Sequence, residues 1–253
     1  MSGARLLQMA ATIAGLTVTS NIVAEPNRAE ELEHLRIDTG YIIEAGELEV
    51  NIVPSYFDYD GERRQEIEAE LEYAISDRLM VEVEVPYRRM SFDGAGEDID
   101  GAGNVELGAK WLLAEGENFS GSFGVGVALP SSDDRPGISD DLWGVDLSVP
   151  FTLRFPDRSM SLHVEAGMEW KEQEGFEEQL LNVAIERRPD GRNITLQLGS
   201  NIVHEESDWE AYLIPAFEIA ATAIPFQFGM GVAAGLTSES ADWGLLADFE
   251  VEF

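Results

Sequence analysis

The amino-acid sequence predicts an all-β fold, an antiparallel up-and-down transmembrane β-barrel of about twelve strands. Three observations support this prediction. From Gly46 onward, stretches of roughly ten residues alternate apolar and polar side chains and are separated by clusters of Gly, Asp, Asn, Pro or Ser. The chain ends on such a stretch, residues 243–253. Every second connection is short and the others are mostly longer, which is typical of transmembrane barrels.

The N-terminal residues precede this repeat and differ from it. Residues 1–24 are expected to be a signal peptide, because Arg5 is followed by mostly apolar or small residues that are interrupted too often for a spanning helix. The alternative is a cytosolic amphipathic helix. Residues 25–45 are predicted to be a short periplasmic lead-in, and residues 46–253 the transmembrane β-barrel.

Twelve segments carry the alternation, and each has about the 9–11 residues that a transmembrane strand needs. In the clearest one, residues 143–155, odd positions are apolar and even positions polar or small, and Pro150 is expected to cause a bulge or another local irregularity. An even strand count returns both ends of the barrel to one side. The predicted strands are residues 47–57, 65–76, 79–90, 104–113, 119–129, 143–155, 162–170, 180–188, 194–203, 209–220, 226–236 and 243–253.

The closing strand ends on an aromatic residue, Phe253. A terminal aromatic strand is typical of bacterial outer-membrane barrels, in which the assembly machinery recognises it, so Phe253 is the predicted assembly signal. The five Trp residues lie near strand ends, where an interfacial aromatic girdle would lie. A soluble all-β sandwich is the alternative, but it does not predict the asymmetric connections.

The chain is strongly acidic, with 16 Lys and Arg against 49 Asp and Glu residues and a formal net charge of -33. This balance argues against nucleic-acid binding and against docking on anionic lipid. It agrees with a saline habitat, with divalent-cation partners or with an acid-lined pore. The absence of cysteine excludes a disulfide scaffold, a thiol nucleophile, a CxxC metal site and a lipoprotein anchor.

Acidic residues on the predicted strands are expected to face the lumen, because lipid does not accommodate rows of carboxylates. Carboxylates two residues apart on a strand are about 6.6 Å apart and repel by roughly 0.6 kcal/mol at the permittivity of water, which a wet lumen tolerates. The hypothesis is a cation-preferring passage, and the alternative is a solvated or salt-bridged lumen without a role in selectivity. The candidate residues are Glu66, Glu68, Glu70, Glu72, Glu82, Glu84, Arg88, Glu106, Lys110, Arg154, Glu165, Glu169, Asp248 and Glu250.

Glycines at inward positions bear on whether the lumen is open. A barrel of about twelve strands has a narrow interior that side chains can fill. Inward glycines are expected to leave space, which favours a pore over a filled barrel. These glycines are Gly108, Gly124, Gly126, Gly144, Gly167, Gly229, Gly231 and Gly235.

One acidic loop is a weak candidate for calcium binding. Residues 92–103 combine glycines with oxygen ligands, but their spacing does not match an EF-hand loop. An acidic solvated loop is the favoured interpretation, so no metal site is predicted. The weak candidates are Asp93, Glu97, Asp98 and Asp100.

The three histidines do not indicate catalysis. His34 lies in the lead-in, His204 lies in a loop, and His163 points inward by parity. A lipid hydrolase needs its catalytic pair on the lipid side, so this placement is unsuitable. His163 is expected to form a satisfied lumen pair with Glu165. The sequence therefore predicts no catalytic residue, no cofactor and no enzyme.

Three blocks of sequence, residues 71–87, 103–111 and 124–130, resemble in order a family of outer-membrane β-barrel proteins labelled as transporters of the meta-pathway of phenol degradation. The strand repeat extends this resemblance from about residue 35 to residue 253. Asn104 stands where that family often has Asp, and Ser131 and Ser132 stand where it usually has Thr and Gly. The resemblance implies a barrel that passes small solutes, among them aromatic compounds, and it carries no defined site residues.

The sequence as a whole predicts a passive channel for small solutes in the Gram-negative outer membrane, reached by export through the periplasm. Its expected partners are outer-membrane lipid, a small-molecule solute and the barrel-assembly machinery, with no nucleic acid. The alternative is a closed barrel that serves as a scaffold or binds a partner or divalent cations.

Overall fold

The computed structural model of the 253-residue chain describes residues 39–93, 98–130, 138, 143–156, 159–172, 175–189, 193–205, 208–221 and 224–253. The predicted signal peptide and residues 25–38 of the predicted lead-in lie outside the described residues. Within the described part, no helix is long and apolar enough to cross a membrane. The described residues from 39 to 252 belong to one compact unit and build the barrel.

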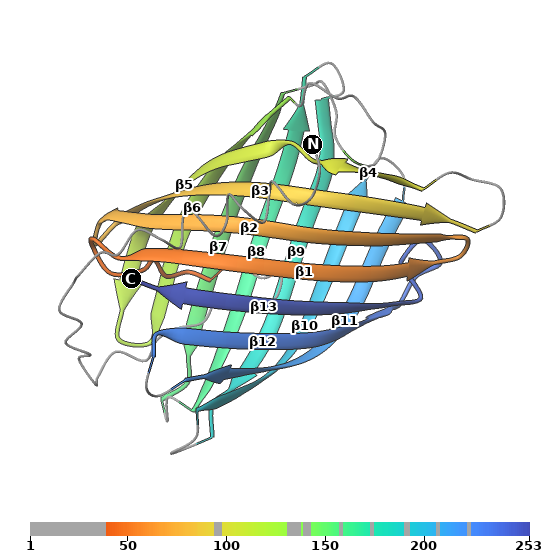
Figure 1. The fold of residues 1–253 in the computed structure, drawn as a ribbon. Helices are drawn as coiled ribbons and strands as arrows, with labels where there is room; N and C mark the ends of the chain where they lie inside the picture. The colour runs from red at the N-terminus through yellow and green to blue at the C-terminus, as the bar shows by residue number, and fades with distance from the viewer. Residues whose placement is uncertain are drawn as a thin grey trace. The chain divides into compact units, whose positions relative to one another are not determined.

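Thirteen strand segments follow one another in the part of the chain that the structure describes (Figure 1). Each coincides with one of the predicted alternating segments except the short fourth one. Their bounds are β1 Leu48–Tyr59, β2 Glu62–Ser76, β3 Leu79–Phe92, β4 Ile99–Ala102, β5 Val105–Gly116, β6 Phe119–Leu129, β7 Gly144–Arg154, β8 Met160–Lys171, β9 Gly175–Arg187, β10 Ile194–Glu205, β11 Asp208–Ala220, β12 Phe226–Gly235 and β13 Trp243–Glu252.

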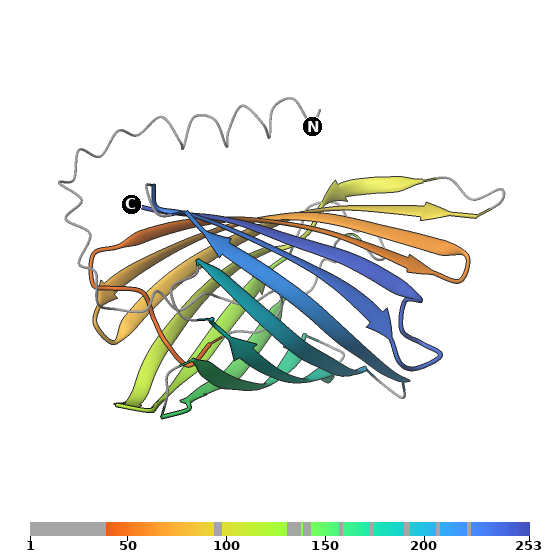
Figure 2. The same cartoon turned by 90° about the horizontal axis from the view of Figure 1, so that it is seen from below.

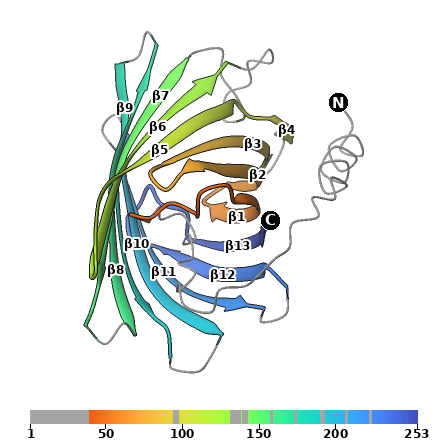
Figure 3. The ribbon, with the colours of Figure 1, turned by 90° about the vertical axis from the view of Figure 1, so that its left-hand side faces the viewer.

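The strands form a closed antiparallel ring. Each strand pairs with the next one along the chain, except that β3 pairs with both β4 and β5, and β1 pairs with β13, which closes the ring. β4 and β5 pair with successive parts of the same β3, residues 87–90 and 79–84, and therefore occupy one position in the ring. The ring thus has twelve positions, which confirms the predicted fold class. Figure 2 shows the first strands, in orange, beside the last strand, in blue, and Figure 3 views the ring along its interior.

The two faces of the ring differ in polarity, because successive residues of a strand point to opposite sides. The outer face exposes large apolar side chains, such as Trp111 at 57% and Val149 at 52% exposure. Inward positions hold buried polar groups, such as Thr152 and Asn182. Along β7, the exposed side chains occupy the odd positions that the sequence marked as apolar.

Pro150 does not produce the bulge that was one of its predicted effects. β7 pairs with β8 through Pro150↔Glu165 without a shift in register. On the other side, pairing with β6 is absent beside Pro150, since it stops at Gly121↔Phe151 and resumes in the same register at Gly124↔Ser148. The missing N–H of proline therefore interrupts the ladder on one side only.

The connections are less asymmetric than predicted. The connection between the predicted strands 47–57 and 65–76, expected to be one of the longer ones, is a tight turn at Asp60 and Gly61, because the pairing of β1 with β2 continues to Tyr59↔Glu62. Gly61 adopts the left-handed backbone conformation, with φ 86°, that such a hairpin turn requires. Similarly, β10 and β11 pair as far as Glu205↔Asp208. The longest connection, between β6 and β7, still lies at the same end of the barrel as the β1–β2 and β10–β11 turns.

Part of the interior is packed with apolar side chains. A buried cluster joins β1, β11, β12 and β13 with the connection before β13, and its Phe57 and Tyr212 rings meet edge to face with centroids 5.7 Å apart. The Ala241 N–H donates to the Tyr212 hydroxyl over 2.9 Å, so this connection folds against the inner face. The cluster consists of Phe57, Tyr212, Ile214, Ala233, Ala241 and Leu246.

Candidate functional site on the inner face

Acidic residues on β2, β3 and β5 face one another across the strands. The register opposes Glu72 to Glu82 and Glu70 to Glu84, and Glu84 is opposed in turn to Glu106. This arrangement follows from the sequence, because three neighbouring strands carry Glu at inward positions of matching register. Glu68, Glu70, Glu72, Glu82, Glu84 and Glu106 are termed the carboxylate band. All six are buried or half-buried, and Glu72 is the least exposed at 4%.

The basic candidates are distributed around the band. Arg88 Nε donates to the Glu66 carboxylate, so these two residues form an ion pair without net charge. Lys110 is 2% exposed and faces inward from β5. Arg154 lies at the end of β7, where its guanidinium stacks over the Tyr41 ring at 4.3 Å from the ring centre.

Inward glycines next to the band do not leave the empty space that the sequence suggested. A Cβ on Gly108 would lie 1.8 Å from Glu82 Oε1, and one on Gly126 would lie 1.8 Å from Glu106 Oε1. On the opposite side of the ring, a Cβ on Gly235 would lie 2.0 Å from the Ala241 carbonyl oxygen. These glycines accommodate neighbouring groups, and they therefore do not by themselves indicate a pore.

A second group of inward residues, on β7 to β10, is joined by hydrogen bonds. The Asn182 amide nitrogen donates to Glu165 Oε2 over 2.7 Å, and the Asn201 amide nitrogen donates to Asn182 Oδ1 over 2.7 Å. Glu165 was predicted to face inward from its position on the strand. The two amides were not predicted, because their role depends on the register of β9 against β8 and β10. Thr152, His163, Glu165, Asn182, Glu186 and Asn201 are termed the polar network, and all are buried.

His163 belongs to this network through Thr152 and Glu186, and its expected pairing with Glu165 stays a prediction. Its Nδ1 lies 2.9 Å from Thr152 Oγ1, and its Nε2 lies 3.2 Å from Glu186 Oε2. The Thr152 side chain is fully buried, and its hydroxyl oxygen also accepts the Gly40 N–H over 3.1 Å. A hydroxyl enclosed in this way has no open approach for a substrate. Of the other histidines, His204 lies on β10 and not in the predicted loop, with its ring tilted against that of Trp209 at a centroid distance of 4.4 Å, and His34 lies outside the described residues.

The segment just before β1 lies inside the barrel, which the sequence did not predict. Thr39 is 1% exposed, and a Cβ on Gly40 would lie 2.6 Å from the Ser120 carbonyl oxygen. A turn then leads into β1, with the Glu47 N–H donating to the Glu44 carbonyl over 3.0 Å and Gly46 at φ 91°. Figure 3 shows this segment, in red-orange, on the inner side of the ring. Its sequence has no alternation that could have indicated this position.

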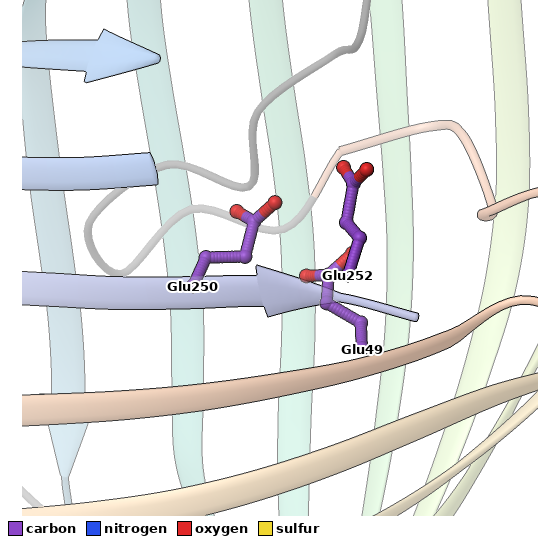
Figure 4. A group of neighbouring side chains, drawn as sticks. All are labelled: Glu49, Glu250 and Glu252. Atoms are coloured by element: carbon purple, nitrogen blue, oxygen red, sulfur yellow. The ribbon is translucent and has the colours of Figure 1, made fainter. Parts of the chain in front are cut away.

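A third acidic group lies where the first and last strands meet. Glu49, Glu250 and Glu252 each bring a carboxylate oxygen within 4.8 Å of the others (Figure 4). Glu250 was a sequence candidate, and Glu49 was not. Asp248, another candidate, is buried beside this group on β13 at 7% exposure. Glu169, also a candidate, lies at the far side of the ring on β8, with its Oε1 3.7 Å from Lys171 Nζ.

The described weak calcium candidates do not converge on one point. Asp93 Oδ1 lies 2.5 Å from Arg63 Nη2, Asp98 Oδ2 lies 2.8 Å from Arg89 Nη2, and Asp100 accepts the Tyr87 hydroxyl. The hydrogen bond from Arg89 lowers the pKa of the Asp98 carboxyl. The fourth candidate, Glu97, lies outside the described residues. Each described carboxylate thus has a neighbouring donor on β2 or β3.

Comparison with known proteins gives structural relatives only. No protein-family model and no curated protein sequence matches the chain. Among solved structures, the COG4313 outer membrane channel from Pseudomonas putida F1 is similar with a TM-score of 0.72 and 14% identity, over 88% of this chain and 100% of that one. The KdgM porin is similar with a TM-score of 0.54 and 10% identity, over 81% of this chain and 99% of that one.

A third similar structure belongs to a different kind of protein, an autotransporter. The β domain of the Bordetella autotransporter BrkA has a TM-score of 0.54 and 11% identity, over 83% of this chain and 100% of that one. At such low identity, the likeness shows the barrel fold alone. Function has to be argued from the residues of this chain, because a fold does not determine it.

Proposed function

We propose that this chain is a channel of the Gram-negative outer membrane that passes small solutes and prefers cations. The observation that carries the proposal is the contrast between the two faces of the closed ring. The outer face exposes aromatic and aliphatic side chains, and the inner face carries the carboxylate band. A ring with this polarity is stable when lipid surrounds it and water enters it.

The preference for cations rests on the sign and position of the inward charges. The carboxylate band holds six acids from three adjacent strands, which outnumber the inward Lys110 of β5, whereas Arg88 is already paired with Glu66. A lumen lined by one sign of charge raises the local concentration of counter-ions and disfavours ions of the same sign. Potassium should therefore cross the barrel more easily than chloride.

The test is single-channel conductance of the folded chain in a planar bilayer under a KCl gradient. Steady conductance with a reversal potential on the cation-selective side is the expected result. Conductance without selectivity would keep the channel and remove the role of the carboxylate band. A reversal potential on the anion-selective side would contradict the proposed preference.

A closed scaffold is the second candidate, and specific contacts favour it. The backbone of Gly40 packs against Ser120, and Ala241 is buried against Tyr212, so parts of the interior are filled. A barrel that folds and shows heat-modifiable migration on gels, yet remains electrically silent, would support the scaffold over the channel.

Transport of aromatic compounds is a further part of the channel proposal. It is supported by the resemblance of residues 71–87, 103–111 and 124–130 to the family labelled as phenol-degradation transporters.

Export and assembly complete the proposal. Residues 1–24 act as the signal peptide, and Phe253, which is 47% exposed, acts as the assembly signal. Deleting Phe253 should reduce the amount of folded barrel in the outer membrane more than it reduces the conductance of each folded molecule. The amount is measured by heat-modifiable migration on gels, and Phe253→Trp is the control that retains an aromatic end. Normal insertion of the truncated chain would count against this role.

A further inference from the structure

We propose that the seam between the first and last strands binds one divalent cation, best matched by Ca²⁺, through Glu49, Glu250 and Glu252. This site is separate from the weak calcium candidates of the loops, and it does not depend on whether the barrel conducts. Two independent observations support this site. The three carboxylates converge, and two buried amides beside them have carbonyl oxygens without a hydrogen-bond partner among the described residues.

The strand register brings the carboxylates together. β1 and β13 pair through Glu49↔Glu252 and through Asn51↔Glu250, so the acids occupy neighbouring inward positions. Glu49 is 3% exposed and Glu250 is 2% exposed, and one oxygen of each of the three acids lies within 4.8 Å of the others. Figure 4 shows the three side chains at the ends of their two strands. Three carboxylates this close, two of them buried and that of Glu252 half-buried, repel one another unless protons or a cation neutralise them.

Two amides border the same carboxylates. The Asn51 amide nitrogen donates to Glu49 Oε1 over 3.0 Å, and the Gln227 amide nitrogen donates to Glu250 Oε1 over 2.5 Å. Both side chains are buried, at 3% and 5% exposure, and their carbonyl oxygens have no hydrogen-bond partner among the described residues. A buried carbonyl oxygen without a partner is unfavourable. Since the nitrogen and oxygen of an amide share one carbon atom, each unpartnered carbonyl oxygen lies close to the carboxylate that its nitrogen contacts.

The donor set indicates which ion would bind. All five side chains supply oxygen, whereas zinc sites in proteins are dominated by nitrogen and sulfur ligands. Ca²⁺ accepts six to eight oxygens from carboxylates, amide carbonyls and water in a flexible geometry. Mg²⁺ requires a near-ideal octahedron and retains several waters, which fits a buried cluster of this kind less well. The geometry therefore favours Ca²⁺ over Mg²⁺ and over transition metals.

Such an ion would join three strands. Glu49 and Asn51 lie on β1, Glu250 and Glu252 on β13, and Gln227 on β12. The pair β1–β13 closes the ring, because these are the first and last strands of the barrel. An ion bound there stabilises the closed state by its affinity for the folded chain.

The experiment uses the folded full chain in detergent, stripped with EDTA and titrated with CaCl₂ or MgCl₂. Calorimetry should show one Ca²⁺ per chain, bound more tightly than Mg²⁺, and Ca²⁺ at about 100 times its Kd should raise the melting temperature by about 5 °C. Glu250→Gln should weaken Ca²⁺ binding by at least about tenfold, because it removes a charged ligand. Glu115→Gln, which removes the same charge at an exposed position of β5, is the matched control and should bind as the unaltered chain does.

Other results would overturn the site. A stripped chain that does not bind Ca²⁺, and whose melting temperature rises only on acidification, would show that protons neutralise the cluster. Binding that survives in Glu250→Gln but disappears in the double variant Asp93→Asn with Asp98→Asn would place the ion in the loop. If Glu250→Gln does not fold, Glu252→Gln, at the last position of β13, provides the same comparison, and unchanged affinity in that variant would refute the proposal.

Discussion

The carboxylate band and the polar network occupy different arcs of one inner face, and they differ in which residues the strand register places opposite their acids. In the band, on β2, β3 and β5, the register opposes carboxylate to carboxylate, as in Glu70↔Glu84. In the network, on β7 to β10, it opposes carboxylate to amide, as in Glu165↔Asn182, and hydrogen bonds follow. Like charges on opposed positions destabilise a sheet, whereas amide–carboxylate pairs stabilise it.

This difference indicates what surrounds each arc. Carboxylates that face one another need water, mobile cations or donors of the chain around them, because a dry environment of low permittivity increases their repulsion. A hydrogen-bonded network needs neither water nor mobile cations, and here the backbone of Gly40 covers part of it by donating to Thr152. In the proposed channel, the path for ions therefore follows the band, while the network serves as a packed wall.

Neutralising acids of the band should have the largest effect on function. In the double variant Glu68→Gln with Glu70→Gln, the preference for potassium over chloride should fall several-fold, because two charges leave the proposed path. Glutamine has nearly the same shape, so the barrel should still assemble. Glu66 is left unchanged, because its removal would expose the charge of Arg88. The reversal potential under a KCl gradient measures the change.

The matched control removes two charges from the other arc. Glu165→Gln with Glu186→Gln should change the reversal potential much less and should lower the stability of the barrel more, because both acids accept hydrogen bonds within the network. Equal loss of selectivity in the two double variants would show that the arcs do not differ, and it would remove the comparison on which the ion path is based.

Much of the barrel could be predicted from the sequence, because the strand signal is local. Alternation with a period of two assigns each residue of a segment such as 143–155 to a face without knowledge of its neighbours. The inward positions of Glu68, Glu70 and Glu165 followed from the same parity. The twelve positions of the ring followed from the number of such segments, and its closure from the alternating last strand and the pattern of connection lengths.

Contacts that depend on pairing between strands or on irregular segments could not be predicted. Asn182 reaches Glu165 only through the register of β9, and Glu49 meets Glu252 only because β1 pairs with the last strand. Gly108 and Gly126 were interpreted as empty space, since a sequence does not show which neighbouring side chain lies over a glycine. Thr39 and Gly40 lie in a segment without periodicity, so their place inside the ring had no sequence signal.

Displacing the segment before β1 should have an intermediate effect. In Gly40→Val, the new side chain would collide with the backbone of Ser120, which lies 2.6 Å from the position of its Cβ, so the segment should leave the network. Single-channel conductance should rise if this segment obstructs the lumen, while the number of folded barrels stays the same. Ala45→Val, a similar enlargement at an exposed position of the same segment, should leave conductance unchanged. Unaltered conductance in Gly40→Val would show that the packed arc does not limit passage.

Breaking the polar network at its centre should have the smallest effect on conductance and a measurable one on stability. Asn182→Leu removes the hydrogen bonds to Glu165 and from Asn201, leaving buried polar groups without these partners. The expected loss in free energy of unfolding is about 1–3 kcal/mol, the usual result of leaving a buried group unsatisfied, and urea titration of the folded barrel in detergent measures it. Gln179→Leu makes the same kind of change at an exposed position of β9 and should not destabilise the barrel. If both variants unfold at the same urea concentration, the hydrogen bonds of Asn182 do not stabilise the barrel. The polar network and the carboxylate band would then differ only in charge.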